Sequence, residues 1–444
     1  MFKNILVFLS AAVAVLALDY RQQSPLHPGE FPLQDAPQFV FIGADDCAEP
    51  EAIMWLVNFL GGLRNPDGSP VLATFFVNGR YAQNFHSGND TSITRTWHAW
   101  HRAYQAGHEI GNHTFSHWFP DDFDMPREDP RLLSVDRWNA EIISNDLAIT
   151  ANLGIPRSRI QGFRAPFLEY NRAAFEAMIR RGFLYDSSIE EGMQPDQDGT
   201  NRFWPYQITG GSIIDSMQAD WSSGPNDWGY KAIGKFPNSR MWILPVYAYI
   251  VPHDSLAGQL NFRRGLRARV QRNVPWFDRN TGNITGFDFN LYAPKAWGGA
   301  QMRANEVLAT MKHTFHKHFS GNRAPMSIGI HPDYYMPSQD RHYRSAGNHL
   351  QRRRSFEDFI TYVLQYPEVR IITGASLIAW MQNPVPLNAA VPVLNERGEP
   401  TRVQQTPTRP RRPEATQNVE TEETVENEQP IISEDSQEQE ETIE

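Results

Sequence analysis

The sequence predicts an α/β fold built on a mostly parallel sheet or barrel. Short apolar runs alternate with longer segments of helical spacing from Gln38 to about Met381. Such alternation is typical of strands joined by helical crossovers, which pair in parallel. The chain has 444 residues, 40% of them hydrophobic, with 12 Trp and 26 Phe. It is therefore long enough to bury a large core.

The first half of the folded region supplies four predicted strands, each a short run rich in apolar and aromatic residues. We expect these strands at 38–43, 71–77, 160–163 and 183–185. Apolar residues at helical spacing predict helices at 51–63, 97–106, 136–152 and 172–181.

The second half continues the same pattern after a long irregular stretch. We expect strands at 241–246, 327–330 and 369–372, and helices at 304–319 and 355–366. The stretch from about 189 to 300 is rich in Trp, Pro, Gly and Asn, and we interpret it as long loop insertions.

The N-terminus predicts a secretory signal peptide over residues 1–18. Lys3 is positively charged, Ile5–Ala17 is apolar, and Ala14 and Ala17 are small residues suited to cleavage. The apolar run is short for a membrane span, but an uncleaved anchor or a buried first strand stays an alternative. No second apolar run of about 18 residues follows, so we expect no transmembrane span in the mature chain. This predicts a secreted protein, either extracellular, cell-wall-associated or periplasmic.

Two further segments flank the predicted folded domain of residues 38–383. Residues 19–37 contain Pro and Gln and are interpreted as an extended lead-in. Residues 384–444 are rich in Pro, Gln, Thr and Glu, with too little apolar surface to offset the ordering entropy, so we predict a disordered tail.

Charge is concentrated in that tail. The net charge is −10, yet residues 413–444 hold 12 acidic residues and no Lys or Arg, which leaves about +2 for the remainder. A nearly neutral folded part provides no basic field for nucleic acid. Cys47 is the only cysteine, so an intrachain disulfide is excluded.

Paired acids end the first predicted strand. Asp45 and Asp46 suit a metal ligand beside a general base, although most such pairs in loops are turn or capping residues. Further on, His113 and His117 are four residues apart. On a helical turn this spacing places both imidazoles on one face, which suits two ligands of one metal ion.

A third segment, Gly162–Phe167 (GFRAPF), directly follows a predicted strand. Arg164 is suited to hold a carboxylate through a bidentate pair. Pro166 fixes the turn, so that the next backbone N–H points into the site. Taken alone, a structural arginine in a strand-to-helix turn would explain this motif equally well.

Taken together, these segments resemble carbohydrate esterase family 4, the polysaccharide deacetylases, and most closely the chitin deacetylase-like branch of arthropods. The resemblance extends over about residues 38–380. It includes five short motifs besides the paired acids: TFFV at 74–77, GHEIGNH at 107–113, RAPFL at 164–168, YDSS at 185–188 and WPY at 204–206. It implies a distorted (β/α) barrel with long loop insertions.

The resemblance also implies the roles of individual residues. Asp46, His113 and His117 would bind the metal, which is zinc in the family, with cobalt or nickel as substitutes. Asp45 would be the general base and Arg164 would orient it. The Phe167 backbone N–H would contribute to the oxyanion hole.

The late general acid would be His331, at the end of Ile328–His331 (IGIH), with Asp186 as the acid that tunes it. We expect Trp118, Pro166 and Trp204 to line the substrate site, because aromatic faces stack on sugar rings, with plain core packing as the alternative for the tryptophans.

The first motif departs from the family pattern. Here it is Gly43–Cys47 (GADDC), in place of the usual Thr-Phe-Asp-Asp-Gly. Both acids are retained. We interpret Cys47 as a small buried residue, with an inhibitory thiolate ligand as the alternative. The cysteine-rich chitin-binding modules of many arthropod relatives have no counterpart here.

The function implied is metal-dependent removal of N-acetyl groups from GlcNAc units of chitin or a chitin-like polysaccharide, with release of acetate. Several alternatives stay open. They are a deacetylase of peptidoglycan, of xylan or of another acetylated polysaccharide, a carbohydrate-binding protein of the same fold without catalysis, and a structural matrix protein. The sequence carries no signal for the oligomeric state.

Overall fold

The computed structural model describes residues 23–80, 90–118, 128–194, 196–212, 233–391, 393–394 and 400–401. All of them belong to one compact unit, Met1–Thr406. The predicted signal peptide, residues 1–18, lies outside the described residues, as does most of the acidic tail. Among the helices of the described part, none combines the length and the apolar character needed to cross a membrane.

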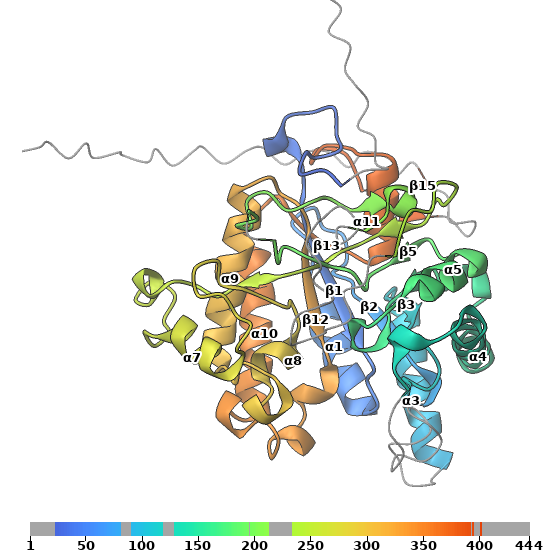
Figure 1. Cartoon of the computed structure of the whole chain (residues 1–444), viewed down its shortest axis with the longest axis horizontal. Helices are drawn as coiled ribbons and strands as arrows, with labels where there is room; N and C mark the ends of the chain where they lie inside the picture. The colour runs from blue at the N-terminus through green and yellow to red at the C-terminus, as the bar shows by residue number, and fades with distance from the viewer. Residues whose placement is uncertain are drawn as a thin grey trace, which may run out of the picture. The chain divides into compact units, whose positions relative to one another are not determined.

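The elements follow one another along the chain largely as alternating strands and helices (Figure 1). The first half contains β1 (Gln38–Asp45), α1 (Pro50–Gly61), β2 (Thr74–Val77), α3 (Asp90–Gln105), β3 (Glu109–Asn112), α4 (Val135–Leu153), β4 (Gly162–Phe163), α5 (Arg172–Arg181), β5 (Tyr185–Asp186), β6 (Glu190–Glu191) and β7 (Tyr206–Gln207).

The second half contains β8 (Trp242–Ile243), β9 (Val246–Tyr247), β10 (Tyr249–Ile250), α7 (Leu266–Asn273), β11 (Asn283–Ile284), α8 (Asp288–Tyr292), α9 (Ala304–Ser320), β12 (Met326–Ile330), α10 (His349–Val363), β13 (Val369–Ile371), α11 (Gly374–Gln382), β14 (Val393–Leu394) and β15 (Pro400–Thr401).

One large sheet organises the fold. Its strand order is β12-β1-β2-β3-β4-β5-β8-β7, and β13 also pairs with β1. Every pairing in it is parallel except that of β7 with β8. From β1 to β5, sequential strands are neighbours in the sheet and are joined by α1, α3, α4 and α5. This is the α/β architecture that the alternating sequence pattern predicts.

Helices cover the sheet on either side. Figure 1 shows α3, α4 and α5 beside β3 to β5, and α9 and α10 beside β12. The strand β1 is buried at every position, and the apolar residues of α1 face the same core. Strands buried on both faces are expected in a parallel sheet with helices around it.

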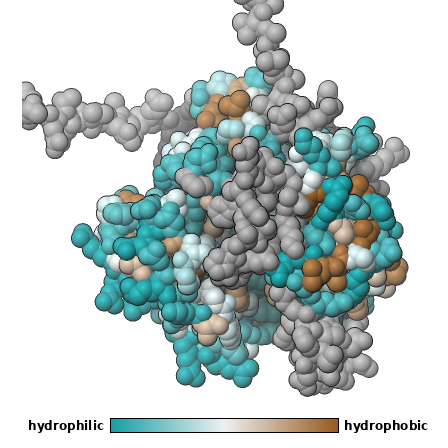
Figure 2. Space-filling view, in the orientation of Figure 1, coloured by the Kyte–Doolittle hydropathy of each residue, from teal (hydrophilic) through white to brown (hydrophobic). Residues whose placement is uncertain are grey.

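Local sequence signals explain where several helices begin and end. Pro50 occupies the first turn of α1, where its missing N–H costs nothing. Asn171 caps α5 by accepting from the Ala174 N–H, and α5 ends at Gly182, whose φ of 83° suits glycine. These caps provide partners for backbone groups at the helix ends. The visible face in Figure 2 is mostly hydrophilic with separate hydrophobic patches.

The structure adds elements that the sequence pattern did not predict. β3 and α11 were not expected, and α10 begins at His349 rather than near residue 355. The stretch 189–300, interpreted as loops apart from the strand predicted at 241–246, contains β6, β7 and β9 to β11 as further short strands, together with α7 and α8, while β8 lies within the predicted strand. Strands of two residues are too short to show a periodicity, which explains why they were missed.

The predicted boundary of disorder at residue 384 is placed too early. Val385 and Val391 pack against a core cluster around Trp380, and the Leu387 N–H donates to the Asp35 carbonyl at 2.8 Å. β14 and β15 then pair antiparallel. A few apolar residues hold the start of this polar segment against the domain. The average composition of 384–444, from which disorder was predicted, does not show them.

Candidate metal and catalytic site

The candidate site residues gather at the carboxyl ends of the parallel strands. Asp45 ends β1, His113 directly follows β3, Arg164 directly follows β4, and His331 directly follows β12. Because parallel strands end at the same edge of a sheet, residues far apart in the sequence converge there. The predicted site residues therefore meet through topology and not through sequence spacing.

Three of these side chains form a compact group of potential metal ligands. One ligand atom from each of Asp46, His113 and His117 lies within 4.8 Å of the others. The Asp46 Oδ1 atom lies 3.6 Å from His113 Nε2 and 3.5 Å from His117 Nε2. One carboxylate and two imidazoles suit Zn²⁺ or a similar transition metal, and leave coordination positions for water and substrate.

The two histidines are not brought together by a helix, contrary to the prediction. Residues 113–118 form a loop after β3, in which Thr114 and His117 have φ angles of 62° and 52°. The imidazole rings still meet, with centroids 5.0 Å apart. The spacing therefore predicted that the two imidazoles lie together. A left-handed turn, and not a helix, brings them together.

A buried glutamate holds this loop in place. Glu141 of α4 accepts hydrogen bonds from the Phe115 N–H at 3.0 Å, the Ser116 N–H at 2.7 Å and the Ser116 hydroxyl at 2.8 Å. Arg137, one turn earlier, pairs with the same carboxylate at 2.6 Å. These bonds compensate the burial of Glu141 and fix the position of His117.

Burial sets the charge states within the ligand group. Burial raises the pKa of Asp46 to about 7, which the nearby His331 partly offsets. Burial also lowers the pKa of His113 to about 4, so this imidazole is neutral at pH 7. His113 Nδ1 is hydrogen-bonded to the Arg164 carbonyl at 2.8 Å, and its Nε2 faces Asp46. A neutral imidazole whose outer nitrogen is anchored is the form that binds metals.

Asp45 lies beside this group and forms a buried ion pair. Arg164 Nη1 donates to Asp45 Oδ1 at 2.7 Å, and both side chains are almost inaccessible. Arg164 also donates from Nε to the Ser187 carbonyl at 2.8 Å and from Nη2 to the Ser187 hydroxyl at 3.0 Å. The guanidinium is thus hydrogen-bonded on three nitrogens, as a buried ion pair requires.

Gly43 makes this ion pair sterically possible. A Cβ atom at this position would lie 2.5 Å from Arg164 Nη1 and 2.7 Å from Nη2. The rings of Phe76 and Phe287 also flank the guanidinium carbon, at 4.3 and 5.1 Å from their centroids. Arg164 is therefore confined to one path from β4 to the Asp45 carboxylate.

His331 has a carboxylate partner, but this partner is Asp288 and not the predicted Asp186. Asp288 Oδ1 lies 2.8 Å from His331 Nδ1, and Asp288 Oδ2 accepts from the His331 backbone N–H at 2.8 Å. Burial lowers the pKa of His331, but the carboxylates of Asp288 and then Asp46 outweigh it and raise the pKa to about 9.

Asp186 is buried elsewhere, at the end of β5. Its carboxylate accepts from the Ser188 backbone N–H at 3.0 Å and from the Ser188 hydroxyl at 2.6 Å. The Ser188 hydroxyl in turn accepts from the Ala165 N–H. Asp186 therefore holds the turn that contains Ala165, and the prediction that it tunes His331 is wrong.

Phe167 follows β4 in a strained backbone conformation. Its φ is 59° and that of Leu168 is 57°, a region that few non-glycine residues adopt. Its side chain is 46% exposed, with the ring 4.5 Å from that of His117. Pro166 precedes it and is buried. The turn thus places Phe167 beside the ligand group. Pro166 shapes the turn and, being buried, does not line a substrate surface as predicted.

Backbone strain is concentrated at this site. Of the ten non-glycine residues with positive φ among those described, seven lie in its loops: Asp46, Cys47, Thr114, His117, Trp118, Phe167 and Leu168. Such conformations cost about 1–3 kcal/mol each and persist where the surrounding structure imposes them. The observation therefore marks these three loops as positions shaped for function.

Trp118 and Trp204 do not line a substrate surface, contrary to the prediction. Trp118 is fully buried and packs on Trp138 with centroids 4.4 Å apart. Trp204 is 1% exposed and stacks on Trp380 at 5.7 Å. Neither indole face is open to a sugar ring, so both tryptophans belong to the core.

Cys47 is buried against the core and lies outside the ligand group. Its Sγ atom lies 3.4 Å from the Asp45 carbonyl. Burial, together with the nearby carboxylates, raises the pKa of the thiol well above its usual range. A protonated buried thiol behaves as a small apolar side chain, as expected, and not as a thiolate ligand.

Three further residues support the site and were missed in the sequence. Asn78, after β2, donates to Asp46 Oδ1 at 2.6 Å. Asp288, described above, begins α8 within the supposedly irregular region. Asp333 accepts from the Ala48 N–H at 2.8 Å and the Glu49 N–H at 3.1 Å, which joins the loop after β1 to the loop after β12. No spacing rule relates these residues to the ligands, because only the fold brings them near.

Part of this site lies in a segment that matches a known protein family. Residues 68–185 match the family model described as polysaccharide deacetylase. This segment contains His113, His117, Arg164 and Phe167 but ends before Asp288 and begins after Asp46. The fold therefore completes the arrangement from residues on both sides of the matched segment.

Individual relatives extend the similarity over most of the chain. The chain is 24% identical to chitin deacetylase 8 of Bombyx mori over 377 residues, which is 83% of this chain and 77% of that one. It is 22% identical to chitin deacetylase 1 of Bombyx mori over 364 residues, and this match spans about half of that protein, 53%.

Among solved structures, a predicted polysaccharide deacetylase from Mycobacterium smegmatis is 16% identical, with a TM-score of 0.47, over 81% of this chain and 95% of that one. A family 4 carbohydrate esterase from Streptomyces lividans in complex with acetate is 21% identical, with a TM-score of 0.23, over 34% of this chain and 62% of that one.

Proposed function

Because residues 68–185 match the polysaccharide deacetylase family model, we propose that this chain is a metal-dependent hydrolase that removes N-acetyl groups from GlcNAc units of chitin or a chitin-like polysaccharide. One observation carries the proposal. A potential metal-ligand group, Asp46, His113 and His117, lies beside an arginine-paired carboxylate, Asp45, and a carboxylate-paired histidine, His331. Amide hydrolysis needs each of these parts.

We assign the metal position to Asp46, His113 and His117, with Zn²⁺ as the expected ion. The donor set fits such an ion, because His113 presents Nε2 to Asp46 while Nδ1 is anchored by the Arg164 carbonyl. When bound, the ion supplies Lewis acidity that activates a water molecule and polarises the acetamide carbonyl. Cobalt or nickel would serve as a substitute in the same donor set.

Asp45 is the general base in this proposal. A base must accept a proton from the attacking water while keeping its own orientation. The single strong bond from Arg164 to Asp45 Oδ1 orients the carboxylate, and Asp45 Oδ2 lies 4.0 Å from His113 Nε2, on the side of the ligand group. Oδ2 is therefore the oxygen that we expect to take the proton.

His331 is the general acid. The amine leaves only when it is protonated, and Asp288 holds His331 in its protonated form near neutral pH. His331 Nε2 lies 3.9 Å from Asp46 Oδ2, so its free nitrogen faces the ligand group. The Phe167 backbone N–H, placed by its strained turn, would stabilise the oxyanion. The products are acetate and a glucosamine unit.

The remaining assignments are part of the same proposal. The domain begins at residue 38 and includes the packed residues up to Val391, after a cleaved signal over 1–18 and a lead-in over 19–37. The protein acts outside the cell on an extended polysaccharide. Neither tryptophan named as a substrate contact is retained. Phe167, with 46% of its side chain exposed beside His117, is the aromatic residue that we propose to contact the sugar.

The direct test is acetate release from chitin pentamer by the full-length protein, with zinc, with a chelator, and with zinc restored. We expect release that the chelator abolishes and zinc restores. Release from acetylxylan or peptidoglycan in place of chitin would change the substrate and keep the reaction. Stoichiometric zinc without release from any of these polymers would instead support a carbohydrate-binding protein, and a chain that binds no zinc would support a matrix protein.

A further inference from the structure

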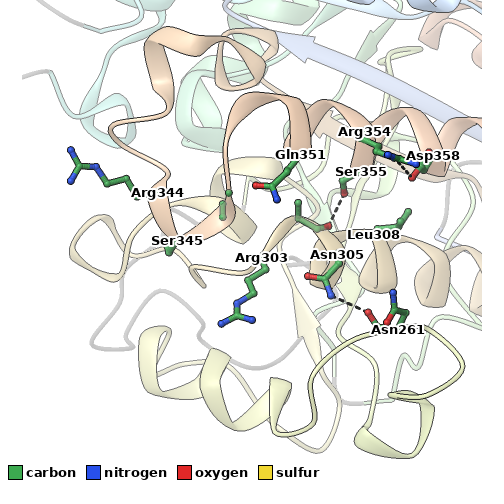
Figure 3. Close-up of a pocket in the computed structure, with 13 residues that line it drawn as sticks. Asn261, Arg303, Asn305, Leu308, Arg344, Ser345, Gln351, Arg354, Ser355 and Asp358 are labelled. Carbon is green, nitrogen blue, oxygen red and sulfur yellow. Dashed lines mark hydrogen bonds and ion pairs between the residues drawn. The ribbon is translucent and has the colours of Figure 1, made fainter.

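A second pocket lies away from this centre. It has a volume of about 480 Å³ and lies between the first turns of α9 and α10, next to the turn Arg344–Ala346 (Figure 3). None of its lining residues takes part in the proposed reaction. A volume of this size is within the range of small-molecule sites.

Positive charge dominates the lining of the pocket. Arg303, Arg344 and Arg354 line it, with Asp358 as the only acidic lining residue. Arg354 Nε lies 3.6 Å from Asp358 Oδ2, so these two charges largely cancel. Arg303 and Arg344 form no ion pair with any described residue, and both are exposed. Two positive charges are therefore left uncompensated at the pocket.

The nearest further acid does not neutralise them. Glu306, in the first turn of α9, is buried and pairs with Arg269. Its other oxygen accepts from the Arg303 backbone N–H at 3.0 Å. Both carboxylate oxygens thus have other partners, and neither pairs with the Arg303 guanidinium. Figure 3 shows the Arg303 side chain extending away from Gln351 toward the open side of the pocket.

The neutral lining groups also favour an acceptor ligand. Gln351 Oε1 accepts from the Asn348 N–H at 3.0 Å, which leaves the Gln351 NH₂ group as a donor. Ser355 donates to the Ala304 carbonyl at 2.7 Å. The pocket lies beside the start of α9, a helix of 17 residues, whose positive dipole end adds to the same field.

We propose that this pocket binds an acidic saccharide unit through its carboxylate. Arg303 would form the bidentate contact that a guanidinium makes with a planar carboxylate, and Gln351 would bind a ring hydroxyl. Arg344 lies at the rim, where Figure 3 shows its side chain turned outward, and its long side chain can fold over the bound anion. Because chitin is neutral, this site is independent of the proposed reaction.

The test is calorimetric titration of the full-length protein with trigalacturonate at about 50 mM salt, with chitotriose as the neutral probe and inorganic sulfate as the small anion. We expect one trigalacturonate bound per chain and no binding of chitotriose to this pocket. Arg303→Gln should weaken trigalacturonate binding about tenfold, since a hydrogen bond to a charged group is lost, and Arg344→Gln should weaken it severalfold. Sulfate should compete weakly.

Arg180→Gln is the matched control. Arg180 is an exposed arginine of α5 with no ion pair to a described residue. Figure 1 shows α5 beside β5, and α9 and α10 beside β12, which is several strands away in the sheet. The Arg180 variant should bind trigalacturonate like the wild type. The proposal is overturned if trigalacturonate does not bind, if the Arg303 and Arg180 variants bind equally, or if sulfate binds more tightly than the saccharide. Acetate release should be the same in all three variants, so failure of this proposal is separable from failure of the proposed function.

Discussion

Replacement of Asp288 by Asn should move the alkaline limit of activity. Asp288 raises the pKa of His331 to about 9, against an ordinary value of about 6.5, even though burial acts in the opposite direction. The net shift corresponds to about 3 kcal/mol in favour of protonated His331, since one pKa unit corresponds to about 1.4 kcal/mol, and Asp288 is its largest favourable cause, followed by Asp46 and Asp45. Asn has nearly the same shape, but it removes the charge and one of the two hydrogen-bond acceptors.

The size of the effect follows from the protonated fraction. At pH 8, His331 with a pKa near 9 is about 90% protonated. If the loss of the Asp288 carboxylate returns the pKa to its ordinary value of about 6.5, only about 3% is protonated. The general acid is thus depleted about thirtyfold, and the rate should fall by a similar factor.

The assay is the pH dependence of kcat for acetate release between pH 5 and pH 10, for wild type, Asp288→Asn and Asp186→Asn. Asp186 is the control because it bonds to Ser188 and not to His331. A thermal melt is needed as well, because the amide NH₂ group that replaces one carboxylate oxygen of Asp288 cannot accept from the His331 backbone N–H. This loss should cost about 1–3 kcal/mol of stability and leave the protein folded.

An unchanged alkaline limb in Asp288→Asn would refute this reasoning. An equal shift of the alkaline limb to lower pH in Asp186→Asn would refute it as well. That result would mean that Asp186 raises the pKa of His331, as first predicted from the sequence. A drop in rate at all pH values without any shift would show that Asp288 acts only by positioning.

Four other outcomes are expected. Asp45→Asn should lower kcat by about 10²- to 10⁴-fold with zinc stoichiometry near one, because a base and not a ligand is lost, which acetate assays and metal analysis will show. His113→Ala should lose zinc, as competition with a chelator will show. Its zinc affinity should fall by more than the about 10- to 100-fold that is typical when a residue hydrogen-bonded to a metal ligand is lost. Asp333→Ala should weaken zinc about tenfold and lower the Tm, because the Ala48 and Glu49 N–H groups lose their acceptor. In the metal-free protein, the stability due to protonated His331 should be complete below pH 6.5 and lost as the pH rises through about 9, since its folded pKa is raised, which denaturant titrations at several pH values will test.

Some site residues belong to local motifs, whereas others are brought to the site only by the fold. Asp45 and Arg164 were predicted at strand ends, and His113 and His117 were proposed from their spacing, because both are local properties of the sequence. The role of His331 came from the family resemblance. Asp288 was not found, because it is 43 residues from His331 and follows two-residue strands with no visible period. A partner at such a distance leaves no trace in local spacing.

The tryptophans show the same division. Their number indicated aromatic surface, but exposure is decided by what packs against each ring. Trp138 covers Trp118 and Trp380 covers Trp204, whereas Phe167 is left exposed by its left-handed turn. Aromatic content alone could not distinguish a core residue from a sugar contact.

The sequence by itself determined the α/β class, the strand-end positions of Asp45, Asp46 and Arg164, and the polar character of the tail, because strand and helix periodicity and motif order are local. Only the tertiary structure decided that Asp288 pairs with His331, that Gly43 gives Arg164 its path to Asp45, and that residues 385–391 pack on the domain. Each of these is a contact between distant segments, which parallel strand pairing creates and no local pattern encodes.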